Sequence, residues 1–186
     1  MQSLCDDREV RPVPGEVLHF SEDPTIEVFV PHVPVTAKGE ESLVWAVDDV
    51  NAPSYWFPRE CPRVCAWLGA GTRAEDRERI LGVGGSERLH AIEYGWLRAV
   101  LGAKLYAYRL PANGFRPLGD PEPYAWVASE TVRPLAPPHA VGDLIALHGD
   151  ADIELRLVPS LARVWAEVKV STLRFSGIRL HNAGIG

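Results

Sequence analysis

The sequence predicts an α+β protein with short helices and a mixed or largely antiparallel sheet. The pattern is compatible with one continuous sheet or with a sheet split into two or more parts. Roughly seven or eight segments have the apolar runs or the alternation of strands, and about three to five have helical periodicity. The helices do not alternate strictly with the strands, so several strands lack the crossover helix of a doubly wound fold. No repeat with a period of about 20–50 residues is present, which excludes a solenoid.

Prolines recur after the short extended segments in the first third of the chain. Residues 17–20 form an apolar run expected to be a strand, and the following Ser-Glu-Asp-Pro favours a brief helical turn that Ser21 caps. Prolines at 31 and 34 restore extended chain around residues 28–30. Residues 43–47 are a continuous apolar run and predict a buried strand, and residues 53–57 predict a short helix that Pro58 ends.

The middle of the chain predicts strands over 63–68 and 89–94, separated by a charged surface helix over 73–81. Thr72 and Glu75 have the spacing of a capping box at the start of that helix. A short helix over 96–101 ends at Gly102. Alternation predicts a strand over 104–110. Further strands are expected over 115–118 and 124–127, and residues 131–135 are expected to continue in the direction of the strand over 124–127.

The last third predicts a helix over 141–148 and an alternating strand over 153–158. Residues 160–168 place leucine, valine and tryptophan on one helical stripe. Residues 172–180 are expected to be extended. A length of 186 residues predicts a single domain over 16–186, preceded by a loose tail over 1–15.

Composition excludes several classes of protein. A hydrophobic content of 46% with six tryptophans excludes a disordered chain. The net charge of −6 argues against general nucleic-acid binding, and no apolar run approaches the length of a membrane span. Three cysteines, an odd number, and no apolar signal segment indicate the reducing cytoplasm. The sequence does not indicate the oligomeric state of the protein.

Common catalytic and metal-binding motifs are incomplete. Gly69-x-Gly71 lacks the remaining residues of a dinucleotide or phosphate loop, and no Gly-x-Ser-x-Gly elbow is present. Cys61 and Cys65 lack a second pair of ligands at zinc spacing, so no metal site is predicted. The arginines around Cys61 would favour a reactive thiolate, whereas the simpler interpretation is a small apolar side chain. His148-Gly-Asp is interpreted as the polar end of a helix.

The segment 53–63 has the composition of a nucleotide site. Three consecutive aromatic residues are held between prolines and followed by two arginines; these residues are Tyr55, Trp56, Phe57, Arg59 and Arg63. Aromatic rings stack on bases, and guanidinium groups bind phosphate. The other interpretation places the aromatic rings in the core and pairs the arginines with Glu60 or solvent.

Two further features add to the candidate site. His19 lies in an apolar strand and points opposite to its neighbours Leu18 and Phe20, which is compatible with a structural role or with a cleft. Residues 155–186 contain five basic residues and one acidic residue, and this basic end, which includes Arg179, either helps to hold an anion or is simply solvated. Ser21 and Trp45 complete the expected ligand-binding set.

The whole chain from Leu18 onward resembles an uncharacterised bacterial family of unknown function. The resemblance lies in the strings Leu18-His-Phe-Ser-Glu-Asp-Pro24, Val44-Trp-Ala-Val-Asp-Asp49, Phe57-Pro-Arg-Glu-Cys-Pro-Arg63 and Ser171-Thr-Leu-Arg-Phe-Ser-Gly-Ile-Arg-Leu-His-Asn-Ala183. These strings imply membership of the family and carry no activity.

A second resemblance, over about the first 70 residues, is to ADP-ribosyltransferase-like folds, the DNA-modifying toxin branch above all. It is carried by the early histidine strand and by Tyr55-Trp56-Phe57-Pro58-Arg59. It implies that NAD is the substrate, that His19 binds the nicotinamide ribose and that the aromatic rings stack on nicotinamide. It also implies that Arg59 supports the reacting groups and that a late carboxylate steadies an oxocarbenium-like state. Glu130, near Val132-Arg-Pro134, is the candidate, with Glu122 on the other side.

The sequence leaves three functions open. The first is an NAD-like nucleotide-binding protein with ADP-ribosyl transfer activity, a glycosyltransferase. The second is a non-catalytic module that binds a small molecule or a protein. The third is an accessory of a toxin–antitoxin or phage-defence system, for which the sequence gives no direct evidence.

Overall fold

The computed structural model describes residues 7–33, 41–120 and 122–184. It divides into two compact units. Unit 1 consists of Met1–Trp56 and Lys104–Gly142, and unit 2 of Phe57–Ala103 and Asp143–Gly186. The described residues form four α-helices and three sheets in which every strand pair except β4–β9 is antiparallel, so the predicted α+β class with a split, largely antiparallel sheet is confirmed. The single domain over 16–186 stays a prediction.

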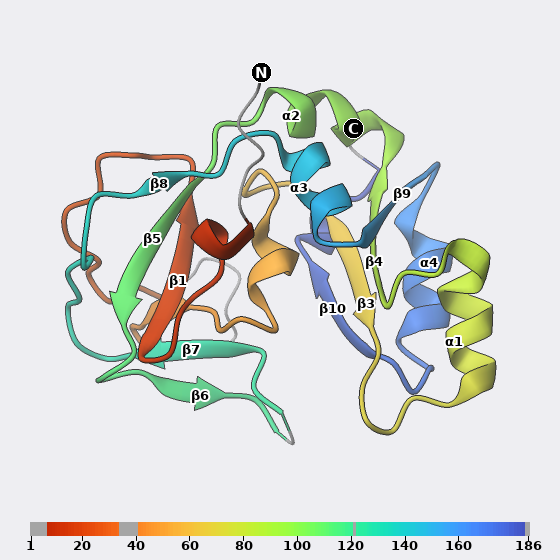
Figure 1. The fold of residues 1–186 in the computed structure, drawn as a ribbon, viewed down its shortest axis with the longest axis horizontal. Coiled ribbons are helices and arrows are strands. Elements are labelled where there is room, and N and C mark those ends of the chain that lie inside the picture. Colours follow the sequence, from red (N-terminus) through yellow and green to blue (C-terminus); the bar gives the residue numbers. More distant parts are fainter. Residues whose placement is uncertain (1–6, 34–40, 121, 185–186) are drawn as a thin grey trace. The chain divides into compact units, whose positions relative to one another are not determined.

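Unit 1 contains two three-stranded sheets (Figure 1). The first has the order β1–β5–β8, with β1 at Glu16–Ser21, β5 at Tyr106–Pro111 and β8 at His139–Ala140. The second has the order β2–β7–β6, with β2 at Val44–Ala46, β7 at Ala125–Ala128 and β6 at Arg116–Leu118. Two short 3-10 helices, η1 at Asp7–Val10 and η2 at Ala52–Tyr55, complete the unit.

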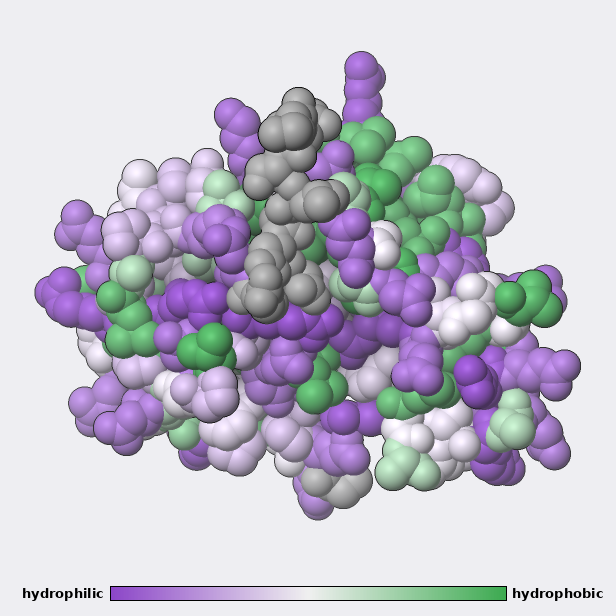
Figure 2. All heavy atoms as spheres, viewed as in Figure 1, coloured by the Kyte–Doolittle hydropathy of each residue, from purple (hydrophilic) through white to green (hydrophobic). Residues whose placement is uncertain are grey.

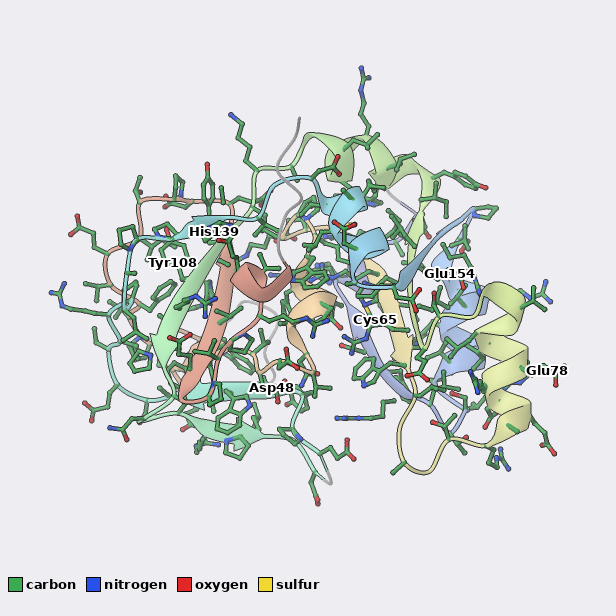
Figure 3. The ribbon with its side chains drawn as sticks, viewed as in Figure 1. Asp48, Cys65, Glu78, Tyr108, His139 and Glu154 are labelled. Carbon is green, nitrogen blue, oxygen red and sulfur yellow. The ribbon has the colours of Figure 1, made fainter. Side chains whose placement is uncertain are left out.

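One hydrophobic core is shared by the two sheets of unit 1. The first sheet contributes Val17, Tyr108 and Leu110, and the second contributes Val44, Ala46 and Ala128. The alternation of side chains along β1 puts Leu18 on the opposite face, where it packs with Val47 and Ala52. His19 lies opposite Tyr108 in the β1–β5 register and therefore shares a sheet face with it. Figure 3 labels Tyr108 on β5.

Unit 2 contains one four-stranded sheet with the order β10–β3–β4–β9. The strands are β3 at Arg63–Trp67, β4 at Arg88–Glu93, β9 at Ile153–Val158 and β10 at Arg174–Ile178. The helices are α1 at Ala74–Ile80, α2 at Leu97–Gly102, α3 at Leu144–Asp150 and α4 at Leu161–Val168. Three 3-10 helices complete the unit: η3 at Gly82–Gly84, η4 at Tyr94–Trp96 and η5 at Leu180–Asn182.

The two faces of the unit 2 sheet differ in character. Val64, Ala66, Leu89 and Ala91 project from one face and pack with α1 and α4 residues in a single apolar cluster. The strand register places Cys65 opposite His90 on the other face, together with Trp67 and Arg88. Polar and aromatic groups thus gather on that second face. Figure 3 labels Cys65 on β3.

Most predicted elements are confirmed, and several are corrected. The strand predicted over 131–135 and the extended segment 28–30 reduce to a single bridge between Val132 and Phe29. The helix predicted over 141–148 begins later, because Gly142 has a φ of +81° and Asp143 caps Leu144–Asp150 by accepting from two backbone N–H groups. Residues 139–140, just before it, form β8.

The predicted capping box at Thr72 is wrong. The residue before α1 is Arg73, whose side chain makes no cap hydrogen bond. The Thr72 hydroxyl instead accepts from the backbone N–H of Gly69 at 2.8 Å. The helix is held by a distant residue, because the backbone N–H of Arg73 donates to the Thr172 hydroxyl at 2.9 Å.

The segment before β1 is packed in the part that the structure describes. Val10 is completely buried, and Arg11 donates to Asp49 Oδ1 at 3.0 Å. Residues 1–6 of the predicted tail lie outside the described residues. None of the helices in the described ranges has the length and apolar character needed to span a bilayer. Figure 2 shows hydrophobic side chains gathered over the α2 segment, where Leu101 is 65% exposed.

Candidate functional site

His19 is held in one orientation on β1. Its Nδ1 lies 2.8 Å from the backbone oxygen of Trp45, and its ring packs on Phe29 with 4.7 Å between centroids. A carbonyl oxygen can only accept a hydrogen bond, so Nδ1 carries the proton and Nε2 of the neutral ring is an acceptor. The side chain is half-buried. Two of the predicted site residues, His19 and Trp45, are therefore brought together.

Trp45 and Tyr55 are both half-buried in unit 1. The buried Nε1 of Trp45 makes no hydrogen bond with a described residue. Tyr55 ends η2 and packs against the cluster around Leu18 and Val47. Both side chains keep part of their surface accessible, and the cluster on which Tyr55 packs lies on the face of β1 opposite to His19.

Ser21 belongs to a turn rather than to a helix start. Its hydroxyl accepts from the backbone N–H of Asp23 at 3.1 Å, and Asp23 in turn accepts from the backbone and side chain of Thr25. The Tyr108 hydroxyl donates to the Asp23 carbonyl at 2.7 Å and accepts from the backbone N–H of Ile26. The brief helical turn predicted at Ser21 is thus a turn closed by side chains.

The other two rings of the aromatic segment are covered by protein groups. Trp56 is completely buried, and the Arg11 guanidinium lies 5.5 Å from its ring centroid. Phe57 is 1% exposed and contacts the rings of His90 and His148, with the Arg63 guanidinium 5.2 Å from its centroid. This burial matches the interpretation of core aromatics for these two rings. Their stacking on nicotinamide stays a prediction.

The predicted arginines surround Glu60 in unit 2. Arg59 Nε lies 3.8 Å and Arg179 Nη2 3.6 Å from Glu60 Oε1. The amide of Asn182 donates to the backbone oxygen of Glu60 at 2.8 Å. Arg179 has a φ of +54°, an uncommon conformation for a residue other than glycine. The structure therefore brings together Arg59 and Arg179, which are far apart in the sequence.

Arg63 and Glu130 lie in contrasting surroundings. Arg63 is 2% exposed and donates from Nη1 to the backbone oxygen of Cys61 at 2.8 Å. Glu130 is exposed in unit 1, two residues before Val132. Val132 exchanges two backbone hydrogen bonds with Phe29, whose ring contacts His19. The candidate carboxylate is thus attached to a segment that borders the histidine.

A pair of buried histidines, missed by the sequence reasoning, lies in unit 2. His90 Nδ1 is 2.9 Å from His148 Nε2, and His148 Nδ1 is 2.6 Å from the backbone oxygen of Leu144. His90 is 0% and His148 1% exposed. We refer to these two residues as the histidine pair. No spacing could have revealed it, because the partners are 58 residues apart.

Burial keeps the histidine pair neutral. Desolvation lowers the pKa of His148 to about 4. The hydrogen bond to the Leu144 backbone raises this pKa, and the nearby positive charge of Arg63 lowers it. Desolvation also lowers the pKa of His90 well below its usual range, and the charges of His148, Arg88 and Arg63 add to this effect. At neutral pH both rings are therefore uncharged bases.

The environment of Cys61 disfavours its thiolate form. Burial raises its pKa to about 12, although the Arg63 charge acts in the opposite direction. This favours the apolar interpretation of Cys61. Among the described residues, no group of three or more histidine, cysteine, aspartate or glutamate side chains is arranged to hold a metal ion.

These features define an α+β protein with short antiparallel strands, an oriented histidine in one unit and a buried histidine pair in the other. The model of the family of unknown function DUF6886 matches residues 18–183, so the chain belongs to that family. The predicted membership of an uncharacterised family is thus confirmed. No curated protein and no solved structure matches the chain. The likeness to ADP-ribosyltransferases stays a prediction.

Proposed function

We propose that unit 1 binds a nucleotide of the NAD type through His19 and the half-buried ring of Trp45. The observation that carries the proposal is the 2.8 Å hydrogen bond from His19 Nδ1 to the backbone oxygen of Trp45. It fixes the ring and makes Nε2 an acceptor, which is the group that a ribose hydroxyl requires.

Trp45 supports the same ligand class. Its Nε1–H is a donor that finds no acceptor in the described residues. A buried donor of this kind is stabilised by an oxygen of a ligand, such as a carboxamide carbonyl. The exposed part of the Trp45 side chain offers a surface for base stacking.

ADP-ribosyl transfer is the second candidate, and the position of Glu130 favours it. In that reaction the bond between ribose C1′ and the nicotinamide nitrogen breaks, and nicotinamide leaves with the electron pair. An acceptor hydroxyl then bonds to C1′, and a carboxylate takes up its proton. Glu130 is exposed on the segment whose Val132 pairs with Phe29, so it is the carboxylate we assign to this step.

Binding without chemistry remains the alternative, and local contacts of two predicted site residues favour it. Arg59 faces the carboxylate of its neighbour Glu60, and the Ser21 hydroxyl is used within its own turn. A guanidinium that faces a neighbouring carboxylate is less available to support the reacting groups, which counts against the transfer step.

Titration of the full chain with NAD, followed by tryptophan fluorescence, tests the binding proposal. His19→Asn keeps a donor for the Trp45 carbonyl but lacks an acceptor at the Nε2 position, so we expect it to fold and to bind NAD at least tenfold more weakly. His19→Gln, which places a polar atom nearer the Nε2 position, should bind better than His19→Asn. The exposed His32→Ala is the matched control. Absence of both quenching and thermal shift at millimolar NAD would exclude the proposal.

Nicotinamide release, measured by chromatography in the presence of NAD, separates the transfer activity from binding. We expect Glu130→Gln to abolish release and to leave the fluorescence titration unchanged. Saturable NAD binding without nicotinamide release in the wild-type chain would establish the non-catalytic alternative.

A further inference from the structure

The hydrogen bonds of the histidine pair determine where its protons lie. The Leu144 carbonyl can only accept, so His148 Nδ1 carries a proton and donates it at 2.6 Å. In a neutral ring His148 Nε2 is then an acceptor, and the group that donates to it at 2.9 Å is His90 Nδ1. The same reasoning leaves His90 Nε2 unprotonated. The chain of hydrogen bonds thus ends in a lone pair.

That lone pair has no partner in the part of the chain that the structure describes. His90 is completely buried, and its Nε2 makes no hydrogen bond with a described residue. A buried acceptor without a donor destabilises a folded protein, so a group of this kind calls for a bound donor.

The surroundings restrict which donor fits. Two guanidinium groups belong to this region: Arg63, which lies over the Phe57 ring that also contacts His90, and Arg88, two residues before His90 on the same sheet face. These positive charges oppose protonation of the ring, so the hydrogen must come from the ligand. A carboxylate or phosphate without a proton has no hydrogen to donate to Nε2. A hydroxyl can donate to Nε2 and accept from a guanidinium.

We propose that the histidine pair is a second binding site, at which His90 Nε2 accepts a hydrogen bond from a neutral hydroxyl group. Leu144 and His148 are positioning residues, because they set the tautomer of His90 without contacting the ligand. The hydroxyl belongs either to a bound water molecule or to a small polyol or sugar. This site lies within unit 2 and is independent of the NAD site proposed in unit 1.

Nitrogen-15 NMR of the full chain at neutral pH tests the proposal directly. Two-bond proton–nitrogen correlations identify the tautomer of each imidazole. We expect both rings of the pair to be neutral and protonated on Nδ1, and we expect His90 Nε2 to have the chemical shift of a nitrogen that accepts a hydrogen bond. A His90 ring protonated on Nε2 would overturn the proposal.

Two further measurements on the same sample separate the sources of the hydroxyl. Magnetisation transfer from water to the His90 ring identifies a bound water molecule. A change of the Nε2 shift on addition of ribose, with loss of the water contact, identifies a sugar hydroxyl. If His90 shows neither a water contact nor a response to ribose, the proposal is wrong.

A variant checks the role of His148. His148→Phe removes the acceptor for His90 Nδ1–H, and we expect the His90 signal to shift toward the tautomer protonated on Nε2. His181→Phe, on an exposed histidine of the same unit, is the control and should leave the His90 signals unchanged. Because the tautomers are first measured in the unaltered chain, the test does not depend on the folding of the variant.

Discussion

The hydroxyl of Tyr108 closes the turn that follows β1: it donates to the backbone oxygen of Asp23 at 2.7 Å and accepts from the backbone N–H of Ile26 at 3.1 Å. Tyr108 comes from β5, more than 80 residues further along the chain. The side chain is completely buried in the core of unit 1. One phenol group therefore satisfies two backbone groups and fixes the turn beside His19.

We expect Tyr108→Phe to lower the free energy of unfolding by about 2 kcal/mol, since two buried hydrogen bonds are lost while the ring stays. Urea unfolding monitored by circular dichroism measures this change. The half-buried neighbour Tyr106→Phe is the matched control and should cost less than about 0.5 kcal/mol. Equal losses for the two variants would show that the Tyr108 hydroxyl contributes nothing particular.

The histidine pair predicts a pH dependence of stability. Unfolded histidine takes up a proton below about pH 6.5, whereas burial lowers the pKa of folded His148 to about 4. The unfolded chain therefore binds more protons between these values, and the free energy of unfolding falls as the pH drops from about 6.5 toward 4. Denaturant unfolding at several pH values measures this slope.

His148→Phe provides the comparison for that slope. The variant removes one of the two buried bases, so we expect a shallower loss of stability over the same pH range. The exposed His181→Phe should keep the slope of the wild-type chain. A slope that is unchanged in His148→Phe would contradict the assignment.

Asp76 predicts a different dependence, at lower pH. Its Oδ2 accepts from the backbone and hydroxyl of Thr172 at 2.9 and 2.6 Å, and Arg79 donates to Oδ1 at 2.7 Å. The Thr172 hydroxyl and the Arg79 guanidinium hold the pKa of this carboxyl well below its usual range. The stability that Asp76 contributes is therefore complete above about pH 4 and is lost as the pH falls further.

We expect Asp76→Asn to lower the melting temperature by several degrees at neutral pH, because an amide N–H then faces groups that also donate. Glu75→Gln, on an exposed neighbour in α1, is the control and should leave the melting temperature nearly unchanged. Differential scanning calorimetry measures both. If the two variants melted alike, the contacts of Asp76 would not stabilise the α1 segment.

The buried cysteines predict low thiol reactivity. Burial raises the pKa of Cys61 to about 12, so the thiol is protonated at neutral pH, and Cys65 is equally inaccessible. In a Cys5→Ser background, we expect almost no reaction with a disulfide reagent in the folded state and two thiols per chain after addition of urea. Fast reaction of Cys61 in the folded state would support a thiol enzyme instead.

Local patterns predicted the fold better than they predicted the site. The alternation and apolar runs at residues 17–20, 43–47 and 153–158 reflect neighbours in the chain, and all three strands form. The start of α3 and the cap of α1 were misplaced because Gly142, Asp143 and Thr172 decide them. Thr172 lies 99 residues from the backbone group that it caps, beyond the reach of any local rule.

The same limit applies to the functional groups. The orientation of His19 could be predicted from strand alternation, but its hydrogen bond to Trp45 depends on pairing between distant segments. His148 was interpreted only as the polar end of a helix, which it is, and His90 was not singled out. The pairing of Cys65 with His90 follows from sheet register, which a single sequence does not specify.

The chain order of the two units has a consequence for biosynthesis. Unit 2 begins at Phe57 but is interrupted by Lys104–Gly142 of unit 1 and resumes at Asp143. Once residue 142 has been synthesised, all of unit 1 is present. The strands β3 and β4 are also present, but their neighbours in the sheet, β10 and β9, have not yet been synthesised. During that interval the two central strands have unpaired edges, and His90 has yet to acquire its neighbour His148 from α3. The histidine pair therefore cannot form before residue 148 has been synthesised.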